Sequence, residues 1–168
     1  MAITKKTLSS VGGFAVNEVT VVNELRDIKN VNTFEIQNSN YTDAKRKEYI
    51  LKGTNTAILD LDEVGGLIPL ENNTVNFVTA HIVGVNASGS GHYSTKIETV
   101  VTCASNGSTN ILSSLETVIK DSIPFGESWS VTPYSAAVNT FSYSGVRAGT
   151  TVAIKWIAQV DVVQVTWT

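Results

Sequence analysis

The sequence predicts a mainly β protein: a β-sandwich or jelly-roll-like domain over residues 61–168, preceded by an extended N-terminal arm over residues 1–60. From residue 49 onward, short runs rich in Val, Ile, Thr and aromatic residues recur at intervals of roughly 8–15 residues. The segments between these runs are rich in Gly, Asn and Ser, which favour turns. Within the longer runs, apolar and polar residues alternate with a period of two, as in strands that bury one face. This combination is typical of sandwiches and jelly rolls.

The first half of the arm lacks a clean helical stripe. Residues 1–13 are small and polar and end in two glycines, so we expect them to order only against a partner. Beyond them, β-branched residues come in short runs separated by Asn, which predicts short strands over 19–22 and 33–36. A helix over 23–29 is the alternative for the intervening stretch.

The second half of the arm is expected to hold a turn and then a short helix or loop. Thr42 or Asp43 is a candidate cap for a single helical turn. The only dense basic cluster follows at residues 45–47, between Asp43 and Glu48. Because acidic residues flank it, we expect a solvated surface there rather than a nucleic-acid site.

Strand patterns dominate the rest of the chain. Between residues Tyr93 and Cys103, alternate residues share one predicted buried face. Residues 111–119 fit both a strand and a helix, and the sequence leaves this open. Trp129 and Trp156 are expected in the core, where aromatic side chains bury large areas. The predicted strands cover residues 49–52, 57–61, 75–85, 93–103, 129–132, 141–144 and 151–168.

In the last of these strands the apolar row changes face. The even-numbered residues are apolar from Val152 to Val162, whereas the apolar residues that follow are Val163, Val165 and Trp167. Because side chains alternate along a strand, a phase change of one residue exchanges its two faces. The change indicates either a β-bulge at Val162-Val163, which returns the tail to its own core, or a tail that buries against another subunit.

Composition argues against several classes of protein. The formal net charge of −3 gives no electrostatic basis for binding nucleic acid. No window approaches the ~18 apolar residues of a membrane span, and residues 1–10 lack the apolar stretch of a secretory signal. The single cysteine favours folding in a reducing cytosol. Residues 1–63 hold 17 of the 27 charged residues. The rest of the chain therefore has few surface charges to oppose association with other molecules.

The sequence carries no catalytic signature. It has neither a Gly-x-Ser-x-Gly elbow nor a His-Glu-x-x-His motif. Cys103 ends an apolar alternation, so we expect a small buried core residue rather than a nucleophile activated by either histidine. The acidic stretch 60–63 lacks the spacing of a calcium-binding loop. We therefore expect no enzyme, no metal and no cofactor.

Carbohydrate binding is harder to dismiss on sequence grounds. Tyr134, Tyr143 and His92 are candidate glycan contacts, since they accompany loops rich in Asn, Ser and Thr. Glu98 and Asp161 would suit a glycosidase carboxylate pair, but nothing in the sequence places them together.

Three segments near the end of the chain form a recurring pattern. They are the strand Trp129-Ser-Val-Thr, the Gly-containing turn 145–149 and the closing strand Ile154-Lys-Trp-Ile-Ala-Gln-Val. In this order they resemble the C-terminal β-rich domain of tailed-bacteriophage virion proteins, over about residues 75–168. The resemblance is a pattern of strands, not a catalytic signature. It implies a β-sandwich in a fibre, a tail appendage or a capsid-attached protein, often trimeric.

We therefore expect a non-enzymatic virion structural protein, a tail fibre, appendage or connector made in the host cytoplasm. Its expected partners are further copies of itself, as a homotrimer, and other virion proteins, with no nucleic acid or membrane. Main-chain pairing and apolar burial would drive its assembly. The alternatives are a capsid cement or decoration protein and a receptor module for a host glycan. The expected interface residues are Phe14, Val19, Val21, Val163, Val165 and Trp167.

Overall fold

All regular secondary structure in the described part of the chain is β-strand. The computed structural model describes residues 14–16, 19–22, 28, 31, 33–135 and 137–167. The chain divides into two compact units, Met1–Asn32 and Thr33–Thr168. In the first unit, β1 (Phe14–Val16) pairs antiparallel with β2 (Val19–Val22), which confirms the strand predicted there. The alternative helix over 23–29 falls almost entirely outside the described residues.

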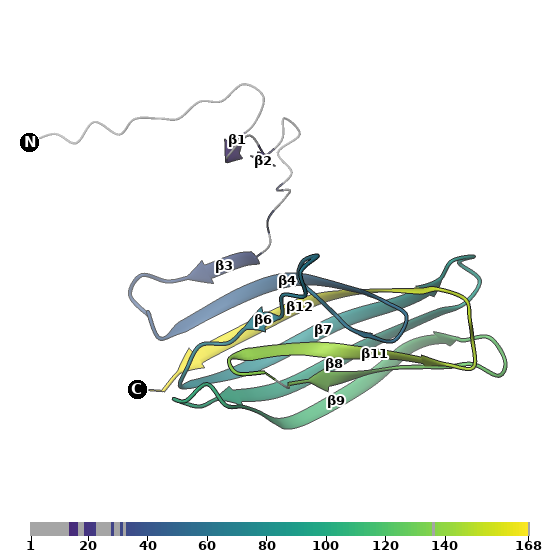
Figure 1. Ribbon diagram of the computed structural model, residues 1–168. Helices are drawn as coiled ribbons and strands as arrows, with labels where there is room; N and C mark the ends of the chain where they lie inside the picture. Colours follow the sequence, from purple (N-terminus) through teal and green to yellow (C-terminus); the bar gives the residue numbers. More distant parts are fainter. Residues whose placement is uncertain are drawn as a thin grey trace, which may run out of the picture. The chain divides into compact units, whose positions relative to one another are not determined.

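Six antiparallel strands form the larger sheet of the second unit, in the order β3–β4–β12–β7–β8–β9 (Figure 1). β12, the last strand in the sequence, therefore lies in the middle of the sheet, hydrogen-bonded to β4 on one side and β7 on the other. The strands are β3 (Thr33–Gln37), β4 (Ala44–Thr54), β12 (Ile154–Thr166), β7 (Thr74–Asn86), β8 (His92–Cys103) and β9 (Thr109–Ser122).

A smaller sheet covers one face of the larger one. β10 (Ser128–Tyr134) pairs with β11 (Thr140–Ala148), and β11 also pairs with the short strands β5 (Ala57–Ile58) and β6 (Ile68–Pro69). In Figure 1, β11 lies in front of the larger sheet. The two sheets enclose one apolar core, which confirms the predicted mainly β, sandwich-like fold.

The period-two alternation seen in the sequence builds this core. Every second residue of β8 from Tyr93 to Cys103 is buried, and so is every second residue of β12 from Ile154 to Gln164. Burying one large apolar side chain completely contributes about 1.5–3 kcal/mol. The largest fully buried apolar side chains are Trp156, Tyr143, Phe141, Leu51, Leu59, Ile68, Ile82, Ile97 and Ile154.

Trp156 occupies the centre of the core. A Cβ added at Gly84 on β7 would lie 2.4 Å from the indole ring, and one added at Gly145 on β11 would lie 3.0 Å from it. Both strands therefore need glycine where the ring crosses them. The indole Nε1 donates a hydrogen bond of 2.7 Å to the carbonyl oxygen of Asn55, in the turn between β4 and β5. Asn55 adopts φ = 64°, a left-handed conformation that asparagine tolerates.

Two expectations about the first 60 residues need correction. The boundary between the units falls after Asn32 rather than after residue 60, because β3, β4 and β5 are integral strands of the sandwich. Residues 44–54 form β4, not the short solvated helix or loop expected around residues 42–48. Alternation along β4 points Arg46 outward and turns Lys47, only 7 % exposed, toward the interior.

The inward lysines of β4 both pair with Glu71, which lies between β6 and β7, and Lys47 Nζ also lies 3.5 Å from Glu35 Oε2. Glu71 Oε1 accepts hydrogen bonds from Lys45 Nζ at 2.6 Å and Lys47 Nζ at 3.0 Å, and its Oε2 accepts one from Gln164 Nε2 at 2.9 Å. Burial alone would raise the pKa of Glu71. The three hydrogen bonds together outweigh this effect and lower the pKa from its usual 4.5 to about 2. The carboxylate of Glu71, which comes from a distant loop, therefore allows two lysine side chains of β4 to point toward the interior.

The phase change expected in the final strand does not occur. β12 pairs with β4 and β7 in unbroken register, and its burial alternates without interruption through Val162 and Gln164. The bulge interpretation is therefore wrong. Gln164 takes a core position because its amide reaches Glu71. The ambiguous segment 111–119 is part of a strand, with two register shifts between β8 and β9.

Candidate interaction face

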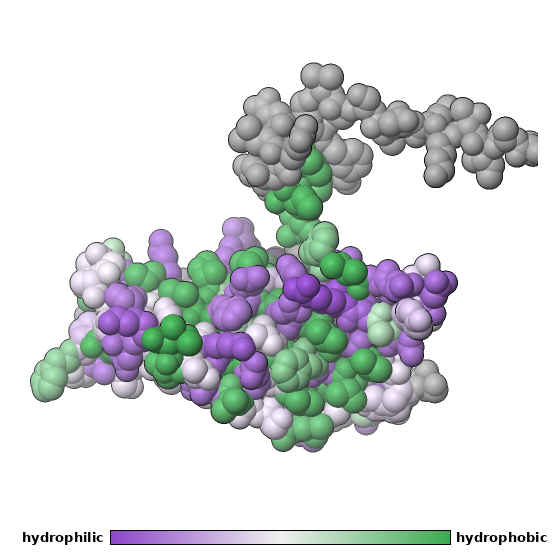
Figure 2. Space-filling model, turned by 180° about the vertical axis from the view of Figure 1, so that it is seen from behind, coloured by the Kyte–Doolittle hydropathy of each residue, from purple (hydrophilic) through white to green (hydrophobic). Residues whose placement is uncertain are grey.

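The larger sheet exposes many apolar side chains on the face turned away from the smaller sheet, which we call the outer face. Figure 2 views the molecule from behind the orientation of Figure 1 and shows hydrophobic residues scattered among hydrophilic ones. The largest apolar patch on a monomeric protein typically covers about 300–600 Å² and is often functional. Ten large apolar residues of the outer face are 40–58 % exposed: Phe34, Ile36, Ile50, Val75, Phe77, Val83, Ile157, Val163, Val165 and Trp167.

Five of these residues form a contiguous group, the apolar ladder, made of Val75 and Phe77 on β7 and Val163, Val165 and Trp167 at the end of β12. Val163 lies directly opposite Phe77, and Val165 lies opposite Val75. The Trp167 N–H donates a hydrogen bond of 2.9 Å to the carbonyl oxygen of Asn73, so the backbone pairing continues past the end of β12. Residues opposite one another on a sheet face are close enough to interact.

Sequence reasoning identified only part of the ladder. It selected the apolar residues after Val162 because they interrupt the alternation of apolar and polar residues along the strand. It missed Val75 and Phe77, because apolar residues occupy both faces of β7 and alternation there does not reveal which face is exposed. Only the register between β7 and β12 places all five residues together.

A charged row borders the ladder. Arg46 Nε donates hydrogen bonds to the two carboxylate oxygens of Asp161 at 2.8 and 3.0 Å, and Arg46 Nη2 contacts both Asp161 and Glu48. The hydrogen bond and the charge of Asp161 raise the pKa of Arg46. On β8, Lys96 Nζ lies 2.7 Å from Glu98 Oε1. These charges are therefore largely compensated within one copy of the chain.

A hollow of about 410 Å³ lies between the apolar ladder and the charged row. Phe77 and Val163 form its apolar side. Polar groups from the same two strands and from β4 form the remainder. The lining residues are Arg46, Phe77, Thr79, His81, Gln159, Asp161 and Val163.

The two carboxylates considered as a glycosidase pair lie in one row across the outer face. Asp161 pairs with Thr79, and Thr79 pairs with Glu98 on the far side of β7. Each carboxylate already binds a cation of the same face, Arg46 for Asp161 and Lys96 for Glu98. In a single copy, both carboxylates of this row are therefore held in ion pairs.

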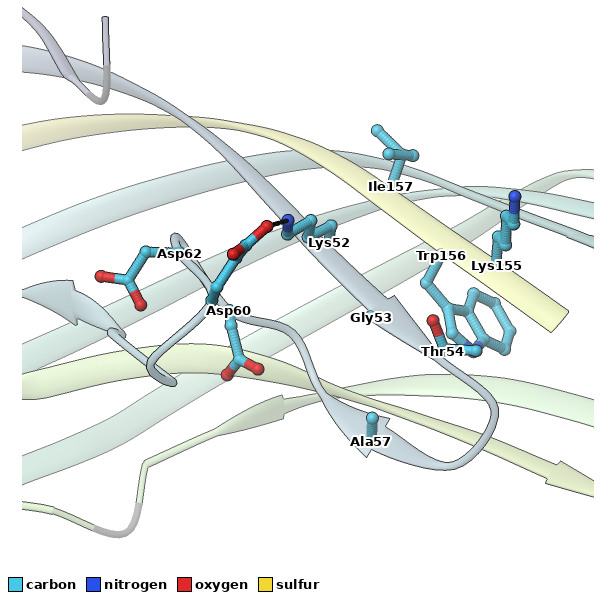
Figure 3. Close-up of a pocket in the computed structure, with 10 residues that line it drawn as sticks. Lys52, Gly53, Thr54, Ala57, Asp60, Asp62, Lys155, Trp156 and Ile157 are labelled. Carbon is cyan, nitrogen blue, oxygen red and sulfur yellow. Dashed lines mark ion pairs between the residues drawn. The ribbon is translucent and has the colours of Figure 1, made fainter. Parts of the chain in front are cut away.

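A second, more polar recess lies at the edge of the sandwich. It has a volume of about 500 Å³, and its charged lining residues are Lys52, Lys155, Asp60, Asp62 and Glu63. In Figure 3, Lys52 lies on the side of the acidic residues, whereas Lys155 lies on the far side, beside Trp156. Lys52 Nζ lies 3.9 Å from Glu63 Oε1. Burial, together with the charge of Asp62, raises the pKa of Asp60. Among the residues that the structure describes, no group of three or more His, Cys, Asp or Glu side chains could hold a metal ion.

The structure separates the candidate glycan contacts. Tyr143 is wholly buried, because alternation along β11 turns it into the core beside Phe141, so its ring presents no face for stacking. This corrects the expectation for Tyr143. His92 pairs with Ser122, where β9 ends, whereas Tyr134 ends the following strand β10. Both are partly exposed, but they lie near opposite ends of the sandwich.

The remaining predicted residues lie in separate places. Phe14 lies in β1, and Val19 and Val21 lie in β2, within the first unit. Cys103 is buried on the inner side of β8, whereas His81 is exposed on the outer face. The two therefore point to opposite sides of the sheet.

These features define an antiparallel β-sandwich whose outer face carries a group of exposed apolar side chains beside a row of paired charges. No protein-family model and no curated protein matches the chain. Among solved structures, the chain is similar to a tailspike protein, gp49 of Acinetobacter baumannii bacteriophage Fri1, described as a capsular polysaccharide depolymerase. The TM-score is 0.43 and the identity 16 %, and the match covers 81 % of this chain. The chain spans about a fifth of the tailspike, 21 % of its length.

Membrane insertion through a helix finds no support in the described residues. None of them belongs to a helix with the length and apolar character needed to cross a bilayer.

Proposed function

We propose that the chain is a non-enzymatic structural protein of a tailed-phage virion, of the fibre or appendage type, that acts by self-association. The apolar outer face is the observation that carries this proposal. Ten large apolar residues stay about half exposed in a single copy, and burying them against further copies would be favourable. The compensated charges beside them lower the cost of removing water from this face.

The class of particle rests on the strand pattern that the chain shares with phage virion proteins. The residues that carry the resemblance form β10, the end of β11 and β12. β12 contains both the closing-strand pattern and two residues of the apolar ladder, Val163 and Val165, and Trp167 follows directly after it. The same strand therefore supports the family assignment and the mode of action.

The arm supplies the second proposed contact. β1 and β2 form a two-stranded sheet, and an isolated hairpin is at best marginally stable in water. We assign Phe14, Val19 and Val21 to a contact that completes this hairpin on another subunit or on another virion protein. A homotrimer, the state common in the proteins that the chain resembles, is the proposed assembly.

A structural role also agrees with the positions of the side chains that were considered as catalytic candidates. Cys103 and His81 point to opposite sides of the sheet, so they cannot act together as nucleophile and base. Asp161 and Glu98 are each held in an ion pair. The burial of Tyr143 weakens the alternative of a glycan receptor, because it removes one of its three candidate contacts.

Two measurements test the proposal. Light scattering behind gel filtration should give a mass near 54 kDa, three times the 18.0 kDa of one chain. Cryo-electron microscopy of intact particles should then place the protein on the tail rather than over the capsid surface. A monomer at all accessible concentrations would refute self-association. Density on the capsid lattice would instead favour a cement or decoration protein.

A further inference from the structure

The outer face carries a projecting aromatic residue beside a recess large enough to receive one. Trp167 is 46 % exposed, whereas Trp129 and Trp156 are 4 % and 0 % exposed. Its backbone is held by the hydrogen bond to Asn73, so the side chain has a defined origin at the end of the ladder. An exposed Trp on a fixed backbone is the kind of residue that dominates binding energy at interfaces.

The hollow offers the groups that an indole ring binds. Phe77 and Val163 supply apolar contact on one side, and both are nearly half exposed in a single copy. Arg46 supplies a guanidinium group that Asp161 holds in a bidentate pair, and such a cation stacks favourably on the face of Trp. The hollow therefore suits an aromatic side chain better than an ion.

Trp167 does not line the hollow of its own copy. It follows β12 and lies four residues beyond Val163, the nearest lining residue of that strand, and six and eight residues beyond Asp161 and Gln159. At about 3.3 Å per residue, these separations are roughly 13, 20 and 26 Å, so the far side of the hollow is out of its reach. The aromatic side chains of the lining, Phe77 and His81, already form part of its wall, so an aromatic side chain that enters the hollow would come from another molecule.

We propose that Trp167 of a second copy of this chain docks into the hollow on the outer face, between Phe77 and Arg46. This inference rests on the proposed self-association and names its central contact. The charges of the face support a second copy as the occupant, because Arg46, Asp161 and Glu48 already compensate one another and require no charged partner. A closed ring or a two-fold pair can both satisfy this contact, since the knob and the recess belong to the same face.

The first test follows the exposure of Trp167 in the intact protein. Since the other two tryptophans are buried, fluorescence that acrylamide quenches readily should come from Trp167 alone. We expect this quenching to fall several-fold as rising concentration drives association. The Trp167→Phe variant, measured in parallel, identifies the contribution of the two buried residues.

The second test is a disulfide crosslink that leaves Trp167 in place. Val165→Cys combined with Gln159→Cys puts one thiol beside the knob and one in the hollow, about 20 Å apart along one strand, too far for a bond within one chain. Val165→Cys with Lys155→Cys is the matched control at the other end of the same strand. Cys103 is buried and should not interfere. Mild oxidation should join copies only in the first variant.

The outcomes distinguish the docking of Trp167 in the hollow from self-association in general. Shielding of Trp167 together with selective crosslinking of the 165/159 pair supports docking in the hollow. A protein that associates while Trp167 stays fully quenchable, or that crosslinks only through the control pair, overturns the docking but leaves self-association intact. A protein that remains monomeric overturns both.

Discussion

Replacing Val163 with lysine tests the outer face where the apolar ladder borders the hollow. Val163 is 48 % exposed and lies between Phe77 on β7 and Arg46 on β4. In a single copy the change should be mild, because the lysine side chain can extend into water. Placing a like charge directly opposite Arg46 costs about 0.2–1 kcal/mol. The variant should therefore fold and unfold much like the wild type.

Association should respond far more strongly than folding. Complete burial of a valine contributes about 1.5–3 kcal/mol, so loss of the exposed half forfeits about 1 kcal/mol per contact. An ammonium group forced into an apolar contact adds a desolvation penalty of several kcal/mol, of which we count about 2 because the side chain can partly escape. The total of about 3 kcal/mol corresponds to roughly a 100-fold weaker association.

Sedimentation velocity over a concentration series measures this effect. The matched control is Val152→Lys, since Val152 has a similar exposure of 44 % but lies in the loop before β12 and outside the outer face. We expect the control to associate like the wild type. Equal association of Val163→Lys and Val152→Lys, with both variants folded, would show that the ladder is not an interface and would refute the reasoning.

Three further predictions concern the stability of the sandwich. Gly84→Ala should cost about 2–3 kcal/mol in urea unfolding, because the new Cβ would lie 2.4 Å from the ring of Trp156; a loss below about 1 kcal/mol would contradict this packing. Acid should destabilise the protein as the pH falls from about 4.5 to about 2, since the lowered pKa of Glu71 makes the unfolded chain bind this proton more readily than the folded one. Because the Glu71 side chain is 46 % exposed, we expect this loss of stability to be only about 1–2 kcal/mol. It is measured as the part of the pH dependence of the unfolding free energy that Glu71→Gln removes. If the variant shows the same pH dependence as the wild type, Glu71 does not have this role. Tyr143→Phe should change stability by less than about 1 kcal/mol, because the buried hydroxyl has no hydrogen-bond partner among the residues that the structure describes. A loss above about 2 kcal/mol in thermal or urea unfolding would contradict this.

Local alternation explains why much of the fold was predictable. The long strands β7, β8 and β12 each bury every second residue, a pattern that is visible in one sequence without knowledge of its neighbours. Cys103, Trp129 and Trp156 were expected in the core and are buried there. Turn residues such as Asn106-Gly107-Ser108 also act locally, because Gly107 adopts φ = 80° between β8 and β9.

The errors have a common physical origin in contacts between distant parts of the chain. Lys45 and Lys47 looked solvated because their neighbours in sequence are charged, yet Glu71 compensates them from another loop. Gln164 looked like an outward residue because it is polar and stands between the apolar residues Val163 and Val165, and the same carboxylate allows it into the core. A prediction from local pattern cannot include a partner that lies 93 residues away.

The candidate face was predictable only in part. Val163, Val165 and Trp167 could be singled out as apolar residues that did not fit their own strand. Their assembly with Val75 and Phe77 depends on which strands are neighbours in the sheet and in what register. The hollow depends on three strands at once, so nothing in the linear sequence marks it.

The position of β12 has a consequence for how the protein is made. The strand that joins β4 to β7 is translated after every other strand of the sandwich, so a nascent chain that ends before residue 154 holds two partial sheets with unpaired edges. It also lacks Trp156, and Gly84 and Gly145 then face an empty centre. The sandwich should therefore complete its folding only after residues 154–166 have left the ribosome. Prematurely terminated chains should be held by chaperones or degraded, which would keep incomplete subunits out of the assembly.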